Sequence, residues 1–441
     1  MKITRTLFQD MVAWKKAPNR KPLIVNGVRQ CGKTWILKEF GKKEFASALY
    51  FNFERDPGLS AFFEGVLDPR AIIRKLEIYV ATEIVPEKTL LIFDEIQTCP
   101  RALTSLKYFC EEAPEYFIAA AGSLLGISLT RGTSFPVGKV DFLDLAPCSF
   151  REFLQAAEPS LARYVGEIGL EPVPLPFADR LSDYLRQYLA FGGMPEVLSC
   201  WLEKHDIEET QNRLEAVIRA YESDFSKHIP ARDTPKLYGI WKSVPAQFAH
   251  ENKRFFYGEV RKGARAKDLE DAMQWLLNAS MIHRVPQVNL PDLPLAAHAD
   301  RKIFKLYLAD VGVLRELAEL PPGPILNSSD VFQDFHGRLA ENYVLQQLNA
   351  MRFSPVCYWV NDSGASEVDF LIQNDSAVIP VETKSGMNVK AKSLRVYREK
   401  YDPVLSVRTS MQNLRLDSGL LNIPLYLMGE FPRLLKLALE H

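Results

Sequence analysis

The chain has 441 residues, of which 47% are apolar, 25% charged and 11% aromatic. About 100–200 residues form a typical domain, so this length predicts two to four domains, and the ordinary composition excludes disorder, collagen and coiled coil as the main architecture. With 54 Lys and Arg against 55 Asp and Glu, the net charge of −1 excludes a basic field over the whole chain, although it leaves a local basic patch open.

Cysteine and histidine are spread along the chain. The six cysteines form no CxxC pair and the seven histidines do not cluster, which indicates neither a disulfide framework nor a zinc site. The N-terminal sequence MKITRTLFQDMVAWKK lacks the apolar core of a signal peptide. No apolar run approaches the ~18 residues of a membrane span. We therefore expect a cytoplasmic protein with no membrane partner.

A glycine-rich loop follows the first predicted strand. The apolar run LIVN predicts a strand buried on both faces, and GVRQCGKT after it matches G-x-x-x-x-G-K-[ST] before a predicted helix. Glycines let backbone N–H groups turn toward phosphate oxygens, and the helix N-terminus favours the anion. Lys33 can reach the β- and γ-phosphates and Thr34 can offer its hydroxyl to Mg²⁺. The expected ATP-binding residues are Gly27, Val28, Arg29, Gln30, Cys31, Gly32, Lys33 and Thr34.

Two acidic residues end another apolar strand. Thr89–Phe93 is followed by Asp94 and Glu95. A carboxylate at the C-terminal tip of a buried parallel strand lies beside the phosphate loop. Asp94 would hold Mg²⁺, directly or through water, and Glu95 would orient and deprotonate the attacking water.

Three further strands, Ala48–Glu54, Tyr116–Ala121 and Lys139–Leu145, are predicted for the same sheet. The second of them runs into Gly122 and Ser123. A small polar residue at that point can sense the γ-phosphate or position the water. A helix or turn cap is the alternative role of Ser123.

Five segments follow one another along the chain in a specific order: GVRQCGKT, LLIFDEIQ, AAGSLLGISL, FPVGKVDFLDLAPCSFREFL and YLAFGGMPEVL. Together they resemble a prokaryotic AAA-type ATPase family over nearly the whole chain. The resemblance implies an additional-strand ATPase core with Ser123 at the sensor position and a C-terminal domain long described as of unknown function. This chain has Gly138-Lys139 where many relatives have Gly-Arg, which argues against a cis arginine finger there and weakens the expectation of a ring. Arg131 and Arg151 are the substitutes that we consider.

The middle of the chain predicts helices. From about Ser149 to Phe225 the pattern is helical, apart from an interruption at EPVPLPFADR, and we interpret it as a lid on the ATPase core. The segment from about Tyr238 to Val288 is similar to the winged-helix element of the same ATPase family. Its stretch from His250 to Lys267 holds six Lys or Arg and two Asp or Glu. DNA contact there stays open beside a solvated or protein-binding face.

The last quarter predicts an amphipathic helix carrying Glu341 and then a strand hairpin. Asp369, twelve intervening residues and then Glu382-Thr383-Lys384 resemble the PD-(D/E)XK nuclease core, and the helical Glu341 supports the match. Alternate residues of a strand share a face, so Glu382 and Lys384 project together and Asp369 can join them. Asp369 and Glu382 can hold Mg²⁺, Lys384 can activate or position water, and Glu341 would complete the cation site.

The chemistry of this last domain stays open. Val368 stands where a proline usually precedes the first aspartate. Nuclease-like folds also persist as binding platforms after catalysis is lost. The segment from Lys384 to Lys400 holds six Lys or Arg against Glu399 alone. It would suit a phosphate backbone, or it is a solvated helix face.

We therefore predict an α/β protein of four parts with ATP and Mg²⁺ as cofactors. These are a P-loop ATPase core at 1–150, a helical lid at 151–230, a winged-helix-like unit and connector at 231–325, and a restriction-endonuclease-like domain at 326–441. The first hypothesis is an ATP-gated enzyme acting on nucleic acid, with DNA favoured. The second is a nucleotide switch whose last domain binds protein or nucleic acid without cutting. A weaker third is an ATPase with a structural tail.

Overall fold

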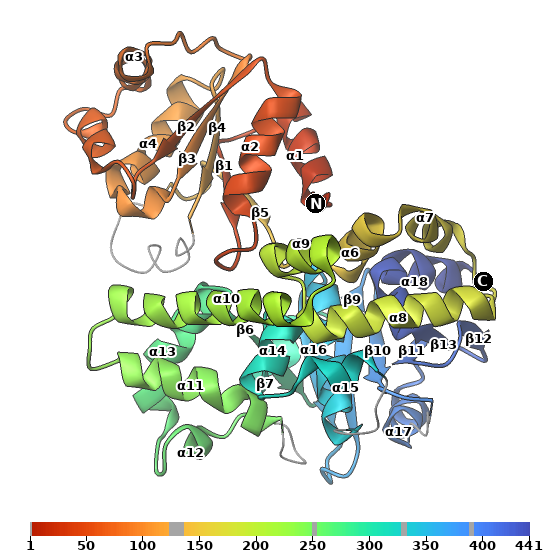
Figure 1. The fold of residues 1–441 in the computed structure, drawn as a ribbon. Helices are drawn as coiled ribbons and strands as arrows, with labels where there is room; N and C mark the ends of the chain where they lie inside the picture. Colours follow the sequence, from red (N-terminus) through yellow and green to blue (C-terminus); the bar gives the residue numbers. More distant parts are fainter. Residues whose placement is uncertain (1, 123–135, 249–253, 328–332, 388–391) are drawn as a thin grey trace. The chain divides into compact units, whose positions relative to one another are not determined.

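In a computed structural model the chain folds into two compact units with separate sheets. The structure describes residues 2–122, 136–248, 254–327, 333–387 and 392–441. The N-terminal unit comprises Thr4–Leu145 and Asn278–Ser280, and the C-terminal unit comprises Met1–Ile3, Ala146–Leu277 and Met281–His441. The predicted α/β class is confirmed, because the first unit holds a parallel sheet and the second a mixed sheet (Figure 1).

The N-terminal unit is built on five parallel strands in the order β2-β3-β4-β1-β5. They are β1 (Leu23–Asn26), β2 (Ser47–Asn52), β3 (Thr89–Asp94), β4 (Phe117–Ala121) and β5 (Asp141–Asp144). Each lies where the sequence predicts a strand. The end of β2 comes at Asn52, before the predicted end, because the Asn52 side chain accepts the backbone N–H groups of Glu54 and Arg55 and turns the chain. The carboxyl ends of all five strands meet at one edge of the sheet.

Helices cover both faces of this sheet (Figure 1). They are α1 (Leu7–Lys16), α2 (Lys33–Glu44), α3 (Pro69–Val80) and α4 (Pro100–Glu112), with short 3₁₀ turns at Pro57–Phe63 and Ile96–Thr98. Leu90 and Ile92 of β3 face α2, which approaches closely at Gly41. The alternate residues Leu91 and Phe93 join the cluster beneath α3 and α4 on the other face.

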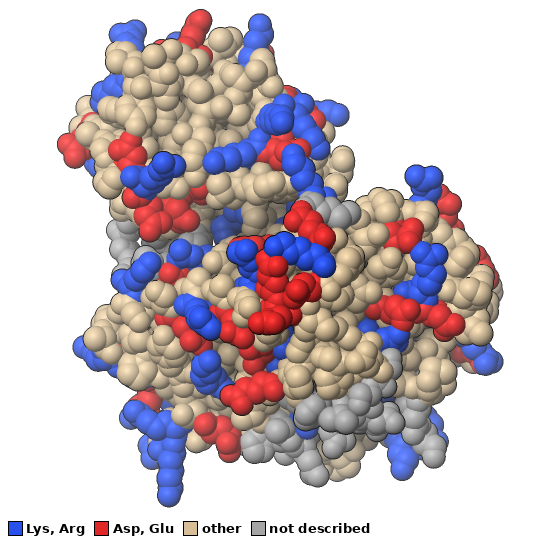
Figure 2. All heavy atoms as spheres, in the orientation of Figure 1, with Lys and Arg blue, Asp and Glu red and all other residues tan. Residues whose placement is uncertain are grey.

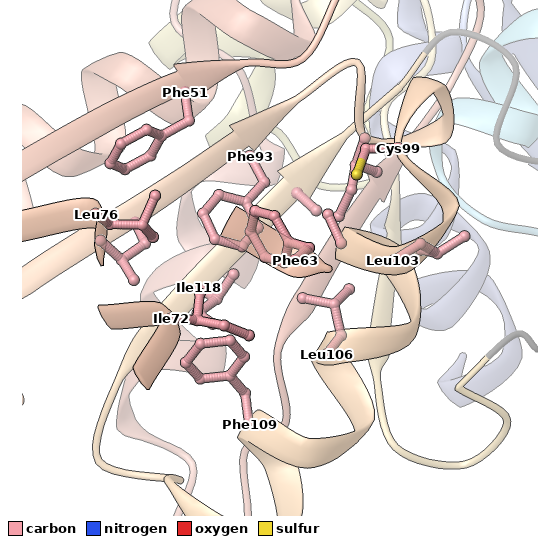
Figure 3. Close-up of a cluster of buried hydrophobic side chains, with 14 of the residues drawn as sticks. Phe51, Phe63, Ile72, Leu76, Phe93, Cys99, Leu103, Leu106, Phe109 and Ile118 are labelled. Carbon is pink, nitrogen blue, oxygen red and sulfur yellow. The ribbon is translucent and has the colours of Figure 1, made fainter. Parts of the chain in front are cut away.

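A cluster of aromatic and aliphatic side chains holds α3 and α4 to the sheet (Figure 3). The Phe93 ring lies 5.9 Å, between centroids, from the rings of both Phe51 and Phe63, in edge-on geometry. Burying an apolar side chain of this size contributes about 1.5–3 kcal/mol. This packing anchors the end of β3 and therefore the acidic residues that follow it.

The first part of the C-terminal unit is helical, as the sequence predicts. Its helices are α6 (Phe150–Ala157), α7 (Pro159–Glu167), α8 (Leu175–Phe191), α9 (Pro195–Lys204), α10 (Ile207–His228), α11 (Thr234–Gln247), α12 (Tyr257–Val260) and α13 (Ala266–Asn278). A capping box between Ser149 and Glu152 begins α6. The interruption at EPVPLPFADR is shorter than predicted, because Pro174 and Pro176 lie at the start of α8, where proline sacrifices no helical hydrogen bond.

The sheet of the C-terminal unit has eight strands in the order β12-β13-β11-β10-β9-β8-β6-β7. They are β6 (Ile282–Val288), β7 (Ala299–Leu308), β8 (Val356–Val360), β9 (Glu367–Asn374), β10 (Ala377–Thr383), β11 (Ser406–Ser410), β12 (Arg415–Asp417) and β13 (Leu420–Pro424). Strand β6 pairs with β8, so one sheet combines strands from the predicted winged-helix-like and nuclease-like parts. The division at residue 325 and the four-part organisation stay predictions.

Among the described residues the further helices are α14 (Val311–Leu317), α15 (Pro322–Leu326), α16 (Gln333–Ala350), α17 (Lys392–Tyr401) and α18 (Phe431–Glu440), with 3₁₀ turns at Leu295–His298 and Leu425–Glu430. The expectation that the helix carrying Glu341 is amphipathic was wrong. All side chains from Leu339 to Leu348 are buried. Asn342, Gln346 and Gln347 are accommodated because their side-chain oxygens accept backbone N–H groups of β7, α14 and α6 at 2.9 Å.

The described part of the chain contains no helix that combines the length and the apolar composition needed to cross a membrane.

Candidate functional site

The phosphate loop joins β1 to α2 at the carboxyl edge of the parallel sheet. Its backbone is left-handed at Gln30 and Gly32, with φ of 63° and 96°, and φ is 141° at Gly27. A side chain on Gly27 would place its Cβ 2.1 Å from the Leu145 carbonyl oxygen. Glycine is therefore required at this position by both the backbone angle and the space.

Lys33 lies inside this loop. Its side chain is buried, and the Nζ ammonium donates to the carbonyl oxygens of Gly27 and Val28 at 2.7 and 2.8 Å. The loop is itself anchored at Cys31, whose carbonyl oxygen accepts from the Arg5 guanidinium at 2.7 Å. The positive charge predicted to meet the phosphates is thus held by two carbonyl groups of the loop.

Asp94 and Thr34 are joined as predicted from their motifs. The Thr34 hydroxyl donates to Asp94 Oδ2 at 2.8 Å, and Asp94 is only 3% exposed. Glu95 contributes its backbone N–H to Asp94 Oδ1 at 3.2 Å. Hydroxyl and carboxylate oxygens are the ligands that Mg²⁺ prefers, so the pair fits the cation of a bound nucleotide.

Tyr50 of β2 is a third partner of Asp94 that the sequence did not reveal. Its hydroxyl donates to Asp94 Oδ2 at 2.7 Å and accepts from Asn52 Nδ2 at 3.0 Å. Burial, with the Asp94 carboxylate adding to it, raises the pKa of Tyr50 to about 12, so the phenol is a donor at neutral pH. The Lys38 ammonium lies 3.5 Å from the centroid of the Tyr50 ring. Only the pairing of β2 with β3 brings this residue to the site.

Glu95 sits at the turn directly after β3. Its φ of 51° places a non-glycine residue in the left-handed region, which costs about 1–3 kcal/mol and often accompanies a functional position. Gln97 Nε2 donates to Glu95 Oε2 at 2.5 Å and holds the carboxylate. Gln97 also went unrecognised in the sequence, where nothing but its short spacing from Glu95 pointed to it.

The remaining candidates of the ATPase site are Ser123, Arg131 and Arg151. Ser123 and Arg131 lie outside the described residues. Lys139, which stands where relatives carry an arginine, forms an ion pair with Glu111 at 2.9 Å. Arg151 belongs to the C-terminal unit, where it pairs with Glu430 at 3.2 Å. The identity of an arginine finger stays a prediction.

The four residues of the predicted nuclease-like motif meet in the C-terminal unit. Glu341, Asp369 and Glu382 are all buried and form what we call the acidic cluster, together with Lys384. Lys384 Nζ donates to Glu382 Oε1 at 2.7 Å, and the backbone N–H of Thr383 donates to Asp369 Oδ2 at 2.8 Å. The hairpin of β9 and β10 therefore brings both carboxylates to neighbouring strands, as expected.

Glu382 is the electrostatic centre of the acidic cluster. Burial and the negative charge of Asp369, with a smaller contribution from Glu341, raise its pKa to about 8 against the opposing charge of Lys384. Its Oε2 atom is buried and has no hydrogen-bond partner in the part of the chain that the structure describes. A buried carboxylate oxygen of this kind fits either a proton or a cation.

Tyr307 of β7 adds a phenol to the acidic cluster. Its hydroxyl donates to Glu341 Oε2 at 3.5 Å, and burial, with the charges of Glu341 and Asp369, raises the pKa of Tyr307 above its ordinary value. Among the described residues, no group of three or more His, Cys, Asp or Glu is arranged to hold a metal ion. The prediction of cation ligands in this cluster therefore concerns the pair Asp369 and Glu382.

Three segments of the chain match known families. Residues 19–154 match the AAA domain, residues 182–323 match a domain of unknown function (DUF8612), and residues 336–428 match another (DUF4143). The first match contains the phosphate loop, Asp94 and Glu95. The prediction of an ATP-binding, AAA-type ATPase core is confirmed for this segment. The match at 336–428 contains the acidic cluster and says nothing about its chemistry.

Solved structures show distant similarity to the chain. The Walker-type ATPase paby2304 of Pyrococcus abyssi has 13% identity and a TM-score of 0.45, with 72% of this chain and 96% of that chain covered. The ORC2 protein of Aeropyrum pernix in its ADP form has 14% identity and a TM-score of 0.34, with 74% and 95% covered. The RuvB Holliday junction branch migration motor of Thermotoga maritima has 12% identity and a TM-score of 0.30, with 64% and 90% covered. No curated protein matches the chain.

Proposed function

We propose that the N-terminal unit hydrolyses ATP with Mg²⁺, using Lys33, Thr34, Asp94 and Glu95. The observation that carries this proposal is the 2.8 Å hydrogen bond from the Thr34 hydroxyl to Asp94, which joins the two motifs at one edge of the sheet. A hydroxyl and a carboxylate in contact are the two protein ligands that a P-loop site offers to the cation of the nucleotide.

Each side chain has a role that follows from its position. Lys33 would neutralise phosphate charge from within the loop, and backbone N–H groups at the start of α2 would hold the phosphate oxygens. Thr34 and Asp94 would hold Mg²⁺, which would supply positive charge against the β- and γ-phosphate oxygens. Glu95, held by Gln97, would orient a water and accept its proton as the water attacks the γ-phosphorus. The bond from the γ-phosphorus to the bridging oxygen would break, and ADP would leave with that oxygen.

The test compares ATP binding and turnover in three variants. Lys33→Ala is expected to lose both. Glu95→Gln is expected to bind ATP normally and to turn it over roughly 10²–10⁴-fold more slowly, the usual contribution of a general base. Lys42→Ala, which removes an exposed lysine from the same helix, is the matched control. Equal turnover in all three variants and the unaltered protein would remove the assigned roles.

We propose secondly that the acidic cluster hydrolyses phosphodiester bonds of nucleic acid with a divalent cation. The observation that favours it is the buried Glu382 Oε2, which has no hydrogen-bond partner among the described residues. This atom lies near Asp369, and Lys384 is bonded to the other oxygen of Glu382. A cation at Asp369 and Glu382 would stabilise charge on the attacked phosphate. Lys384 would position the attacking water, whose oxygen forms the new bond to phosphorus as the bond to the leaving oxygen breaks. The alternative is a binding module that engages nucleic acid or protein without cutting.

Cleavage assays distinguish these two functions. DNA and RNA would be incubated with Mg²⁺ or Mn²⁺ and with the unaltered protein, Asp369→Ala, Lys384→Ala or Asp375→Asn. The last is the control, because Asp375 is an exposed carboxylate in the turn of the same hairpin. Cleavage that survives only in the unaltered protein and the control would support the nuclease. Absence of cleavage with retained, salt-dependent binding would favour the binding module.

The winged-helix-like interpretation of the middle of the chain stays a proposal as well. Arg261, Lys262, Arg265 and Lys267, which surround the short helix α12 and the start of α13, are all exposed. Exposure leaves them available to phosphate groups.

A further inference from the structure

A cavity of about 550 Å³ opens in the C-terminal unit, lined mainly by residues of α17, β11, β12 and β13 and of the segment between β11 and β12. Three arginines line it, and each comes from a different element: Arg398 from α17, Arg408 from β11 and Arg415 from β12. These elements are labelled in Figure 1. A volume of this size lies in the range of cavities that hold small ligands, about 300–1,000 Å³.

The strand register places this arginine cavity on the same sheet face as Glu382. Glu382 of β10 pairs with Arg408 of β11, Arg408 pairs with Asn422 of β13, and Asn422 pairs with Arg415 of β12. Paired residues of neighbouring strands point to the same face, and neighbouring strands lie about 4.8 Å apart. One lateral row of side chains therefore runs from the acidic cluster into the arginine cavity.

The polar side chains in the wall of the arginine cavity are hydrogen-bonded to one another and to the backbone. Asn422 accepts from Arg408 Nε at 2.9 Å and donates to the carbonyl oxygens of Gln412 and Asn413 at 3.0 and 2.9 Å. Asn413 in turn exchanges two hydrogen bonds with the backbone of Val173. The side-chain amides of Asn413 and Asn422 are thus engaged in hydrogen bonds within the wall. The guanidinium groups give the cavity its positive charge.

The arginine cavity carries an excess of positive charge. Its lining includes three arginines and one acidic residue, Asp417, which pairs with Arg415 at 2.7 Å. Over the whole chain the signs are balanced, with 54 basic and 55 acidic residues, and both colours are interspersed over the visible surface in Figure 2. Burial lowers the pKa of Arg408, and the positive charge of Arg415 lowers it further. An anion in the cavity would relieve this repulsion.

We propose that the arginine cavity binds a backbone phosphate of a nucleic-acid strand whose next segment lies over the acidic cluster. Guanidinium groups bind phosphate through paired N–H donors, which suits a phosphodiester. Nucleic acid is preferred over a free anion because the row of side chains that enters the cavity continues to Glu382 of the acidic cluster. This choice of ligand class rests on the second function proposed above. The arginine cavity would then hold the strand in place while a neighbouring phosphodiester meets Asp369 and Glu382.

The experiment measures binding without cleavage. Fluorescein-labelled single-stranded DNA, duplex DNA and single-stranded RNA of one length are titrated with the full chain in EDTA, so that no divalent cation occupies the acidic cluster. The test variant is Arg398→Gln with Arg415→Gln, two side chains at the edge of the arginine cavity. The control is Arg219→Gln with Lys436→Gln, which removes two exposed cations from other helices of the same unit.

We expect the test variant to bind the tightest of the three probes at least about ten-fold more weakly than the control, with the slope of log K against log salt reduced by roughly two. The inference is overturned if the test variant and the control bind equally, or if the unaltered protein binds none of the probes. It is also overturned if the substitutions weaken only the binding of inorganic phosphate.

A parallel cleavage assay separates this inference from the nuclease proposal. If no form of the protein cuts in Mn²⁺ but the test variant still binds more weakly than the control, the arginine cavity is supported and the nuclease fails. If Asp369→Asn abolishes cleavage while the test variant binds and cuts like the control, the nuclease is supported and the arginine cavity fails.

Discussion

The phosphate loop and the acidic cluster gather charged side chains in opposite ways. In the loop each charge already has partners: Lys33 donates to two carbonyl oxygens, and Asp94 accepts from Thr34 and Tyr50. In the cluster three buried carboxylates face one lysine, and Glu382 Oε2 has no hydrogen-bond partner in the described chain. In the first site hydrogen bonds pair these charges, whereas in the second burial and the charge of Asp369 raise the pKa of Glu382 to about 8.

Of the two sites, the phosphate loop depends more strongly on backbone geometry. Gly27→Ala is expected to weaken ATP binding by roughly 100-fold or more, because the new Cβ would overlap the Leu145 carbonyl and occupy a conformation that alanine rarely adopts. Titration with a fluorescent ATP analogue measures the effect. Gly258→Ala is the control, since its Cβ would meet open space. Normal ATP binding by Gly27→Ala would show that the loop is less preorganised than we infer.

The next largest effect concerns the contact between the two ATPase motifs. Thr34→Ala is expected to lower the Mg²⁺-dependent turnover about 10–100-fold, because one hard oxygen ligand and the hydrogen bond to Asp94 are lost together. Thr34→Ser keeps the hydroxyl and should restore most of the activity. Turnover would be measured over a range of Mg²⁺ concentrations. If serine and alanine behave alike, the hydroxyl is not a ligand.

The acidic cluster should make the stability of the protein depend on pH. Because burial raises the pKa of Glu382 from its ordinary 4.5 to about 8, the folded protein binds more protons than the unfolded chain between these values. The free energy of unfolding should therefore fall as the pH rises through this window.

Glu382→Gln removes this titration, so above pH 8 it should be more stable than the unaltered protein by about 1–3 kcal/mol. This difference in the free energy of unfolding is measured by denaturant unfolding from pH 5 to pH 9. The unaltered protein, Glu382→Gln and the control Asp375→Asn are compared. Mn²⁺ should stabilise the unaltered protein at high pH and leave Glu382→Gln unaffected. Parallel pH profiles in all three proteins would contradict the assignment of the buried charge to Glu382.

The smallest effect expected is at Tyr50. Tyr50→Phe removes one of two hydrogen bonds to Asp94 Oδ2 and should cost about 1 kcal/mol of stability, the usual net value of such a bond. Because Thr34 remains bonded to the same oxygen, turnover should fall only several-fold. Thermal unfolding measures the loss of stability, and steady-state ATP hydrolysis measures the loss of turnover. A loss as large as that of Thr34→Ala would mean that Tyr50 has a direct role at the nucleotide.

Local motifs were predictable where their residues lie close together in the sequence. The phosphate loop, β3 and the acidic pair after it lie where the sequence places them, because each is determined by a few consecutive residues. The hairpin bearing Asp369 and Glu382 was predictable for the same reason. Tyr50 and Tyr307 were missed because each reaches its site through pairing or packing of an element that carries no motif of its own.

Helix α16 shows how tertiary packing overrides a local pattern. Its polar residues indicated a solvent-facing side, yet Asn342, Gln346 and Gln347 are buried, since three surrounding elements present backbone N–H groups to them. Likewise, the strands β6 and β7 come from a segment predicted as a separate unit but pair into the sheet that carries the acidic cluster. Sequence periodicity does not specify which distant backbone a side chain will meet.

By itself the sequence determined the α/β class, the ATP-binding loop with its acidic partners, and the identity of the carboxylates and lysine in the last quarter. These follow from spacing along one or two strands, where covalent geometry alone fixes which side chains share a face. The tertiary structure alone decided that Tyr50 bonds Asp94 and that Glu382 is buried with one oxygen that has no hydrogen-bond partner among the described residues. It also decided that three arginines share a cavity and that two of them, Arg408 and Arg415, lie in the same row as Glu382. Those features depend on strand order and desolvation, which arise only when distant segments pack together.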